Sequence, residues 1–212
     1  MLQFNSALLA AVGSFTGKYA PYQSVLITPH AGGVLLAATD AGKVMALGFD
    51  RNGLGDETVT IIPSTELLKA CAGIKTADRG VLIDGDSAIV TTYYKTSSAQ
   101  GKELPIHRSM VPFPPIDAVI SSCLERWGET PTCGETAGRY KVAYLERAIK
   151  NAGLLTDSLV LSAFDGGPLR VQGESIDLCI LLMPQTAEAI PPVPDWLARY
   201  GTQSACANVH CR

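Results

Sequence analysis

Few side chains in this sequence combine into a recognisable reactive group. Its three histidines are His30, His107 and His210, and none of them stands beside a serine or cysteine in a nucleophile motif. The segments Asp84-Gly85-Asp86 and Asp165-Gly166-Gly167 resemble metal or phosphate loops. Both lie between predicted hairpin strands, where Asp and Gly are ordinary turn residues. The sequence therefore favours turns at both places.

Two further kinds of reactive site have little support. A zinc site would need Cys206, His210 and Cys211, with Cys133 as a fourth ligand, and this spacing differs from that of a standard zinc finger. The sequence contains no phosphate-binding Gly-x-x-x-x-Gly-Lys loop. We therefore expect no metal, no cofactor and no enzymatic activity, and we look for a binding function.

The composition is that of a globular protein. The chain has 212 residues, of which 47% are hydrophobic and 17% charged, which suits one large domain or two small ones. The net charge of -3 neither indicates nor excludes nucleic-acid binding, because the distribution of charge matters more than its sum.

The sequence also predicts a compartment. No apolar run approaches the roughly 18 residues that span a bilayer, and no cationic region precedes the apolar residues 8–12, as it would in a secretory signal. Cys71, Cys123 and Cys179 fall on apolar faces of predicted elements, where a thiol packs as a small hydrophobe. We expect reduced thiols and a cytoplasmic protein.

Periodicity predicts four helices. The fourth has Leu145, Ala148, Ile149 and Ala152 at the spacing of one buried helix face, and Ser64 is placed to cap the second. The predicted helices span residues 6–18, 64–74, 117–127 and 144–152.

Strands outnumber helices. The predicted strands span residues 24–28, 33–39, 43–49, 57–62, 80–84, 87–95, 103–111, 159–164 and 169–172, and a last strand ends at Met183-Pro184. Many short strands with few helices predict an α+β fold, with antiparallel sheets and helices on one face. Prolines at 112, 114 and 115 suggest a boundary between domains 1–111 and 112–188. A proline-containing tail, 189–212, follows with a polyproline-like stretch.

Three stretches carry a family resemblance. Residues 58–73 read as a strand followed by a helix, and strands follow over 80–110. Residues 138–184 read as a helix and three strands, closing on Leu182-Met183-Pro184. This order and spacing resembles the beta subunit of bacterial DNA polymerase III, the DNA sliding clamp. The chain has material for one and a half to two of that family's three domains, as a compact, divergent, phage- or mobile-element-type member would.

The resemblance implies a DNA-clamp fold, with antiparallel sheets on the outside and pairs of helices on one face. It further implies a replication processivity factor that encircles or contacts duplex DNA without reading its sequence. Basic side chains on the lining helices would then attract phosphates. The candidates are Lys69, Arg126, Arg139, Lys141, Arg147 and Lys150. The alternative for each is an ordinary solvated side chain. Rings of this family have twelve helices around the hole, so four helices per chain predict a trimeric ring.

The resemblance also implies a groove that docks short peptides from a DNA polymerase or other replication proteins. Its candidates here are Leu181, Leu182, Met183 and Pro184, and a flexible methionine suits a surface that accepts several partners. The alternative is ordinary core packing of a closing strand. A rival function is a non-ring, clamp-derived module, an adaptor or inhibitor of a replication protein, which the oligomeric state would distinguish.

Overall fold

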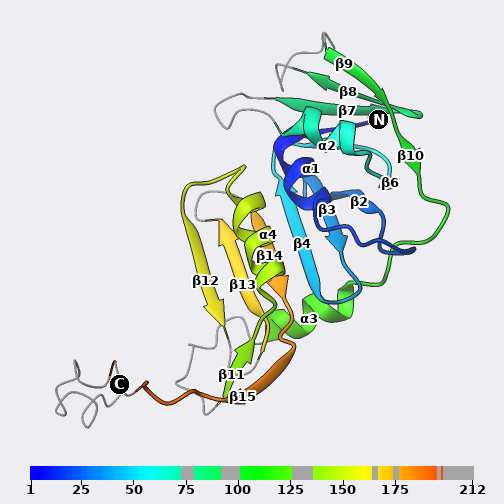
Figure 1. Ribbon diagram of the computed structural model, residues 1–212. Helices are drawn as coiled ribbons and strands as arrows, with labels where there is room; N and C mark the ends of the chain where they lie inside the picture. Colours follow the sequence, from blue (N-terminus) through cyan, green and yellow to red (C-terminus); the bar gives the residue numbers. More distant parts are fainter. Residues whose placement is uncertain are drawn as a thin grey trace.

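A computed structural model describes residues 1–72, 79–91, 101–125, 136–163, 167–173, 177–194 and 197. Its described strands form antiparallel sheets of eight, five and two strands (Figure 1). The predicted α+β fold with antiparallel sheets is confirmed. Among the described residues, no helix is long and apolar enough to cross a membrane.

The same order of elements, one strand, one helix and three strands, occurs three times. The first unit is β1 (Leu2–Asn5), α1 (Ser6–Gly13), β2 (Val25–His30), β3 (Gly33–Thr39) and β4 (Val44–Asp50). The second is β6 (Val59–Ile62), α2 (Thr65–Cys71), β7 (Gly80–Asp84), β8 (Ser87–Thr91) and β9 (Gly101–Pro105). The third is β11 (Thr136–Arg139), α4 (Val142–Ala152), β12 (Leu159–Ala163), β13 (Leu169–Gly173) and β14 (Leu178–Leu182).

Four elements lie outside these units: β5 (Leu54–Gly55), β10 (His107–Arg108), α3 (Asp117–Glu125) and β15 (Thr186–Ala189). The first two units exchange their opening strands. β1 pairs with β7 of the second unit, and β6 pairs with β2 of the first. The resulting sheet orders are β5-β1-β7-β8-β9 and β10-β6-β2-β3-β4-β14-β13-β12, while β11 pairs with β15 in the small sheet.

The eight-stranded sheet crosses the boundary predicted between residues 111 and 112. β4 pairs with β14 from Val44↔Leu182 to Gly48↔Leu178, so the first and third units share one continuous sheet. The Arg51 guanidinium also forms a bidentate ion pair with the carboxylate of Asp177, the residue before β14. The division into domains 1–111 and 112–188 stays a prediction, although backbone pairing now connects the two parts.

Opposite faces of this sheet carry different helices. On one face, Ala46 and Ile180 join a core cluster that includes buried residues of α1, α2 and α4. On the other, Met45 and Leu181 pack with Cys123 of α3. We expected four helices to share one face, but α3 covers the opposite one. Periodicity identifies a helix's apolar side without saying which face of a sheet receives it.

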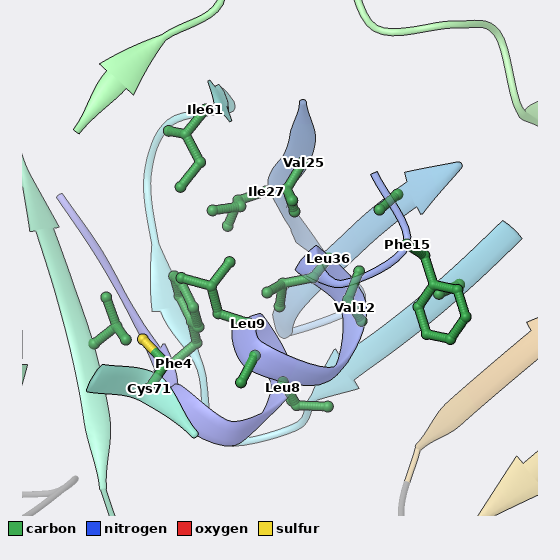
Figure 2. Packing of buried hydrophobic residues seen from close by; sticks show 14 of the residues in the cluster. Phe4, Leu8, Leu9, Val12, Phe15, Val25, Ile27, Leu36, Ile61 and Cys71 are labelled. Carbon is green, nitrogen blue, oxygen red and sulfur yellow. The ribbon is translucent and has the colours of Figure 1, made fainter. Parts of the chain in front are cut away.

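Helix α1 is the centre of the main core. Seven of its eight residues are buried, and Figure 2 shows Leu8, Leu9 and Val12 among side chains from surrounding strands and from α2. We expected this helix to continue to residue 18, but it ends at Gly13. The hydroxyls of Ser14 and Thr16 donate to the carbonyls of Ala11 and Gly13, which turns the chain out of the helix.

The other helices begin or end near their predicted positions. Ser64 caps α2 as predicted, since its hydroxyl accepts from the Leu67 amide at 3.0 Å. The end predicted for that helix, and residues 126 and 127 of the third, lie outside the described residues. Helix α4 begins at Val142, two residues before its predicted start.

Several strands differ from the prediction. The strand expected over 103–111 is two strands, because β9 belongs to the five-stranded sheet and β10 to the eight-stranded one. No bounds were predicted for β1, β5, β11 and β15. Each has four residues or fewer, too short for alternation to stand out.

Candidate functional site

An open pocket of about 360 Å³ lies where the third unit meets the first. We call it the seam pocket. Its lining residues come from the β3–β4 turn, the start of α4 and the chain after β14: Gly42, Lys43, Lys141, Tyr144, Met183, Pro184 and Gln185. The turn has left-handed backbone at Ala41 (φ 50°) and Gly42 (φ 72°), which brings Lys43 toward β14.

Backbone hydrogen bonds hold the seam pocket together. The Met183 amide donates to the Lys43 carbonyl at 3.0 Å, and the Gln185 amide donates to the Arg139 carbonyl at 2.8 Å. Met183 and Pro184 are both half-buried, so the chain passes the pocket in a fixed conformation with part of each side chain accessible. An apolar group therefore has a preformed surface to pack against.

A charged cluster adjoins the seam pocket at Tyr144 and Lys141. The Tyr144 hydroxyl donates to the Asp40 carboxylate at 3.3 Å, and the Arg147 guanidinium lies 3.6 Å from the same carboxylate. Arg147 and Lys141 also stand over the Tyr144 ring, 5.3 Å and 5.5 Å from its centre. Burial, and then the Asp40 carboxylate, raise the pKa of Tyr144, which favours the protonated phenol that donates to Asp40.

The structure divides the four predicted peptide-binding residues into two pairs. Met183 and Pro184 line the seam pocket. Leu181 and Leu182 are each 1% exposed and pack on opposite faces of the large sheet. Their side chains are therefore core residues, and they support the pocket from below without reaching its surface.

The predicted DNA-binding cations have equally different surroundings. Lys69 on α2 and Lys150 on α4 are exposed, and neither takes part in an ion pair within the described part of the chain. Arg147 is half-buried against Asp40, as above. Arg139 donates to the carbonyls of Ala137 and Ala189, which fixes the β11–β15 sheet.

The remaining two candidates complete this set. Lys141 is exposed at the start of α4, where it lines the seam pocket. Arg126 lies outside the described residues. The structure therefore places only Lys69 and Lys150 as exposed cations on helices of the α1, α2 and α4 face.

The groups with possible reactive chemistry are not gathered at this pocket. Cys71, Cys123 and Cys179 are free thiols, and burial raises the pKa of Cys71 to about 12 and that of Cys179 to about 11. His30 packs edge-on against the Phe49 ring. No cluster of potential metal ligands occurs among the described residues, and the residues considered for zinc lie outside them.

Sequence reasoning missed the contribution of the first unit to this site. The Asp40-Ala41-Gly42 turn was predicted as a turn, but nothing in the sequence places it beside residues 183–185. Tyr144 was predicted only as the first residue of a helix. The available signal in the sequence was its spacing of three residues from Lys141, which places the two side chains on the same side of the helix.

The fold is that of sliding clamps. The DNA polymerase III beta subunit of Borrelia burgdorferi, solved with a natural product, superposes with a TM-score of 0.57 at 10% identity, over 87% of this chain and 64% of that one. The Pseudomonas aeruginosa sliding clamp gives 0.57 at 12% identity, over 87% and 66%. PCNA of A. fulgidus, bound to the C-terminal region of FEN-1, gives 0.53 at 11%, over 87% and 98%.

The similarity is structural. The chain spans about two thirds of the length of these bacterial clamps, and nearly the full length of the PCNA chain is covered. No protein-family model matches the sequence, and no curated protein sequence matches it.

Proposed function

We propose that this protein is a compact sliding clamp of DNA replication, a non-enzymatic processivity factor that contacts duplex DNA without sequence preference and docks partner peptides. The observation that carries the proposal is the seam pocket of a clamp-fold chain, which contains Met183 and Pro184. A replication role would place the protein with the chromosome in the cytoplasm, and it would act as a homo-oligomer around DNA.

The seam pocket suits a peptide of defined chemistry. Met183, Pro184 and the Tyr144 ring offer an apolar surface, while Lys43 and Lys141 bring two exposed ammonium groups to its rim. A matching peptide has an apolar anchor side chain and a nearby acidic residue, because opposite charges increase association rate and specificity. A DNA polymerase or another replication protein would supply it.

The helices suit non-specific contact with phosphates, though with fewer cations than the sequence suggested. Among the described residues of helices α1, α2 and α4, Lys69 and Lys150 are the exposed cations without an ion pair. Because α3 lies on the other sheet face, three helices per chain share this side. A lining of twelve helices would then require four copies, in place of the predicted trimer.

Comparing circular with linear plasmid tests whether the protein encircles DNA. A clamp assembled around DNA should remain on a nicked circular plasmid during gel filtration and leave once the plasmid is cut at one site. Lys69→Glu and Lys150→Glu should each weaken association and lower the salt dependence by about 0.9 per phosphate contact. Arg51→Glu, at an exposed cation whose partner Asp177 lies on no helix, is the control of equal charge change. Equal retention on circular and linear DNA would exclude encirclement.

Peptide binding is tested separately. A random peptide library displayed on phage is selected on the wild-type protein, and the affinities of the enriched peptides are measured by fluorescence polarisation. Met183→Asp should lower affinity by about tenfold or more, whereas Met110→Asp, at a methionine 96% exposed, should leave it unchanged. Enriched peptides that bind both variants equally would remove the seam pocket from this role.

A second function is favoured by two observations. The guanidinium groups of Arg139 and Arg147 already bind backbone carbonyls and the Asp40 carboxylate. Helix α1 has no charged residue. These features suit a clamp-derived adaptor or inhibitor that binds a replication protein through the seam pocket and does not surround DNA. Peptide binding without topological retention on plasmid would select this function.

A further inference from the structure

Among the described strands, the outer edge of β12 lacks the neighbour that its two counterparts have. β2, β7 and β12 are each the first strand after the helix of their unit. The outer edge of β2 pairs with β6, and the outer edge of β7 pairs with β1. β12 is the terminal strand of the eight-stranded sheet, and Figure 1 shows it at the end of that sheet away from the first unit. Among the described strands, nothing occupies this edge.

The pairing of the first two units indicates which strand would pair with β12. In the first two units, the edge is filled by the opening strand of the other unit, in a reciprocal exchange. The opening strand of the third unit is β11. Like β1 and β6 it has four residues and leads directly into a helix. It pairs with β15 on one side, as β1 pairs with β5.

The exposed side chains of β12 suit burial. Val160 is 49% exposed and Leu161 54%, and they point to opposite faces of the sheet because they are consecutive in a strand. The strand reads Leu-Val-Leu-Ser-Ala, with none of the charges or prolines that usually protect an edge from pairing. In the paired counterpart β2, Val25 and Ile27 are fully buried.

Helix α4 has a matching open flank. Tyr144 and Arg147 mark the flank that meets Asp40 of the first unit. By helical periodicity, Val142 and Ile149 lie on the other flank, where they are 76% and 46% exposed. In the first two units the corresponding space is filled helix against helix: a methyl carbon added at Gly13 of α1 would come within 2.7 Å of Leu68 of α2.

We propose that a second copy of this chain covers this surface, through a two-fold dimer in which β11 of each protomer pairs with β12 of the other and the two α4 helices pack together. The second copy is the fitting partner because the strand that completes the pattern belongs to the same chain. With a two-fold axis, the β12 edges of both protomers are paired at once and the assembly is closed. The dimer repeats between two chains the exchange that the first two units make within one.

This inference is independent of DNA binding. It concerns only the third unit, which has no partner unit among the described residues, so it holds for a ring and for an adaptor alike. It does bear on ring size: if every third unit is paired with another, closed assemblies contain an even number of chains. Four copies satisfy this condition, and three do not.

Sedimentation velocity over a range of protein concentrations tests the dimer. The wild type should approach twice the 22.4 kDa chain mass, or a multiple of that dimer. Leu161→Lys and Ile149→Glu should each raise the dimer dissociation constant by about tenfold or more, since both bury a charge in the contact. Leu54→Lys, at a leucine 63% exposed on edge strand β5, is the matched control and should behave as the wild type.

Hydrogen exchange distinguishes strand pairing from other association. The amides of β12 and β11 should exchange more slowly at high protein concentration than at low, while those of edge strand β9 should not change. Far-ultraviolet circular dichroism verifies that each variant is folded. A monomeric wild type at every concentration, a dimer that survives both substitutions, or β12 amides indifferent to concentration would overturn the proposal.

Discussion

Helices α1 and α4 occupy equivalent positions in their units but have opposite surroundings. α1 reads Ser-Ala-Leu-Leu-Ala-Ala-Val-Gly, without a charge, and nearly all of it is buried. α4 contains Glu146, Arg147 and Lys150, and only Ala148 and Ala152 are buried. The first helix has α2 of the second unit and α4 of the third as neighbours, whereas α4 has the first unit on one flank only.

The comparison shows that the number of neighbouring units, more than the helix position itself, decides how apolar a helix is. A helix enclosed on all sides must exclude charge, because an unpaired charge there is costly to bury. A helix covered on one side keeps a polar face. Val142 and Ile149 of α4 are apolar residues that remain exposed. The proposed dimer would cover both.

The largest effect on stability should come from truncating a buried side chain of α1. Leu9→Ala removes a fully buried side chain of α1 and should lower the free energy of unfolding by about 2–5 kcal/mol. Leu145→Ala on the half-buried side of α4 should cost about half as much. Urea unfolding of both variants at low protein concentration measures the two costs. Equal costs would show that the two helices are enclosed to the same degree.

A smaller loss should follow from crowding the same helix. A Cβ at Gly48 of β4 would lie 3.0 Å from side-chain carbons of Leu8 and Val12. Gly48→Ala should therefore destabilise the protein by about 1–3 kcal/mol. Thermal unfolding of Leu8→Ala, Gly48→Ala and the double variant forms a cycle. The double variant should lose less than the sum of the singles, and strict additivity would contradict the close packing.

The covered flank of α4 should contribute less than the core of α1. Tyr144→Phe removes the hydroxyl that donates to Asp40 and should cost about 0.5–1.5 kcal/mol. Tyr19→Phe, at a tyrosine 77% exposed, is the control and should change stability by less than about 0.5 kcal/mol. Chemical denaturation measures both. A neutral Tyr144→Phe would show that this flank is held by packing alone.

The smallest effect should be pH-dependent. The Arg51 guanidinium lowers the pKa of the Asp177 carboxyl below its usual value, so the stabilisation is complete above the unfolded-state pKa and is lost as pH falls through the lower folded-state pKa. Because the Arg51 side chain is mostly exposed, water screens the pair and its contribution should be the smallest of these four. Asp177→Asn should narrow the stability difference between about pH 5 and about pH 3. A variant with the wild-type pH profile would exclude this pair as a contributor.

Local turn chemistry explains which elements the sequence predicted well. β3 and β7 have their predicted bounds, and each adjoins a turn with left-handed residues, Gly32 at φ 82° and Gly85 at φ 55°. The sequence did not define the bounds of β1, even though Leu2 and Phe4 alternate with polar residues and are fully buried. Its partner β7 lies far along the chain, and four residues carry too little pattern.

Tertiary information explains the rest. The side of the sheet that α3 covers depends on the path of the chain through Phe113 and Ile116, which periodicity does not specify. The prediction for residues 181–184 came from a resemblance to a strand end, and a strand's side chains alternate between faces. Leu181 and Leu182 therefore entered the core on opposite sides, while Met183 and Pro184, beyond the last ladder pair, reached the seam pocket.

The pairing of β4 with β14 also has a consequence for synthesis. β4 is an interior strand of the finished sheet, yet its neighbour is the last strand of the third unit. As the chain emerges from the ribosome, the Val44–Asp50 edge stays uncovered until most of the protein has been made. Such long-range pairing slows folding and leaves an interval in which nascent chains can associate.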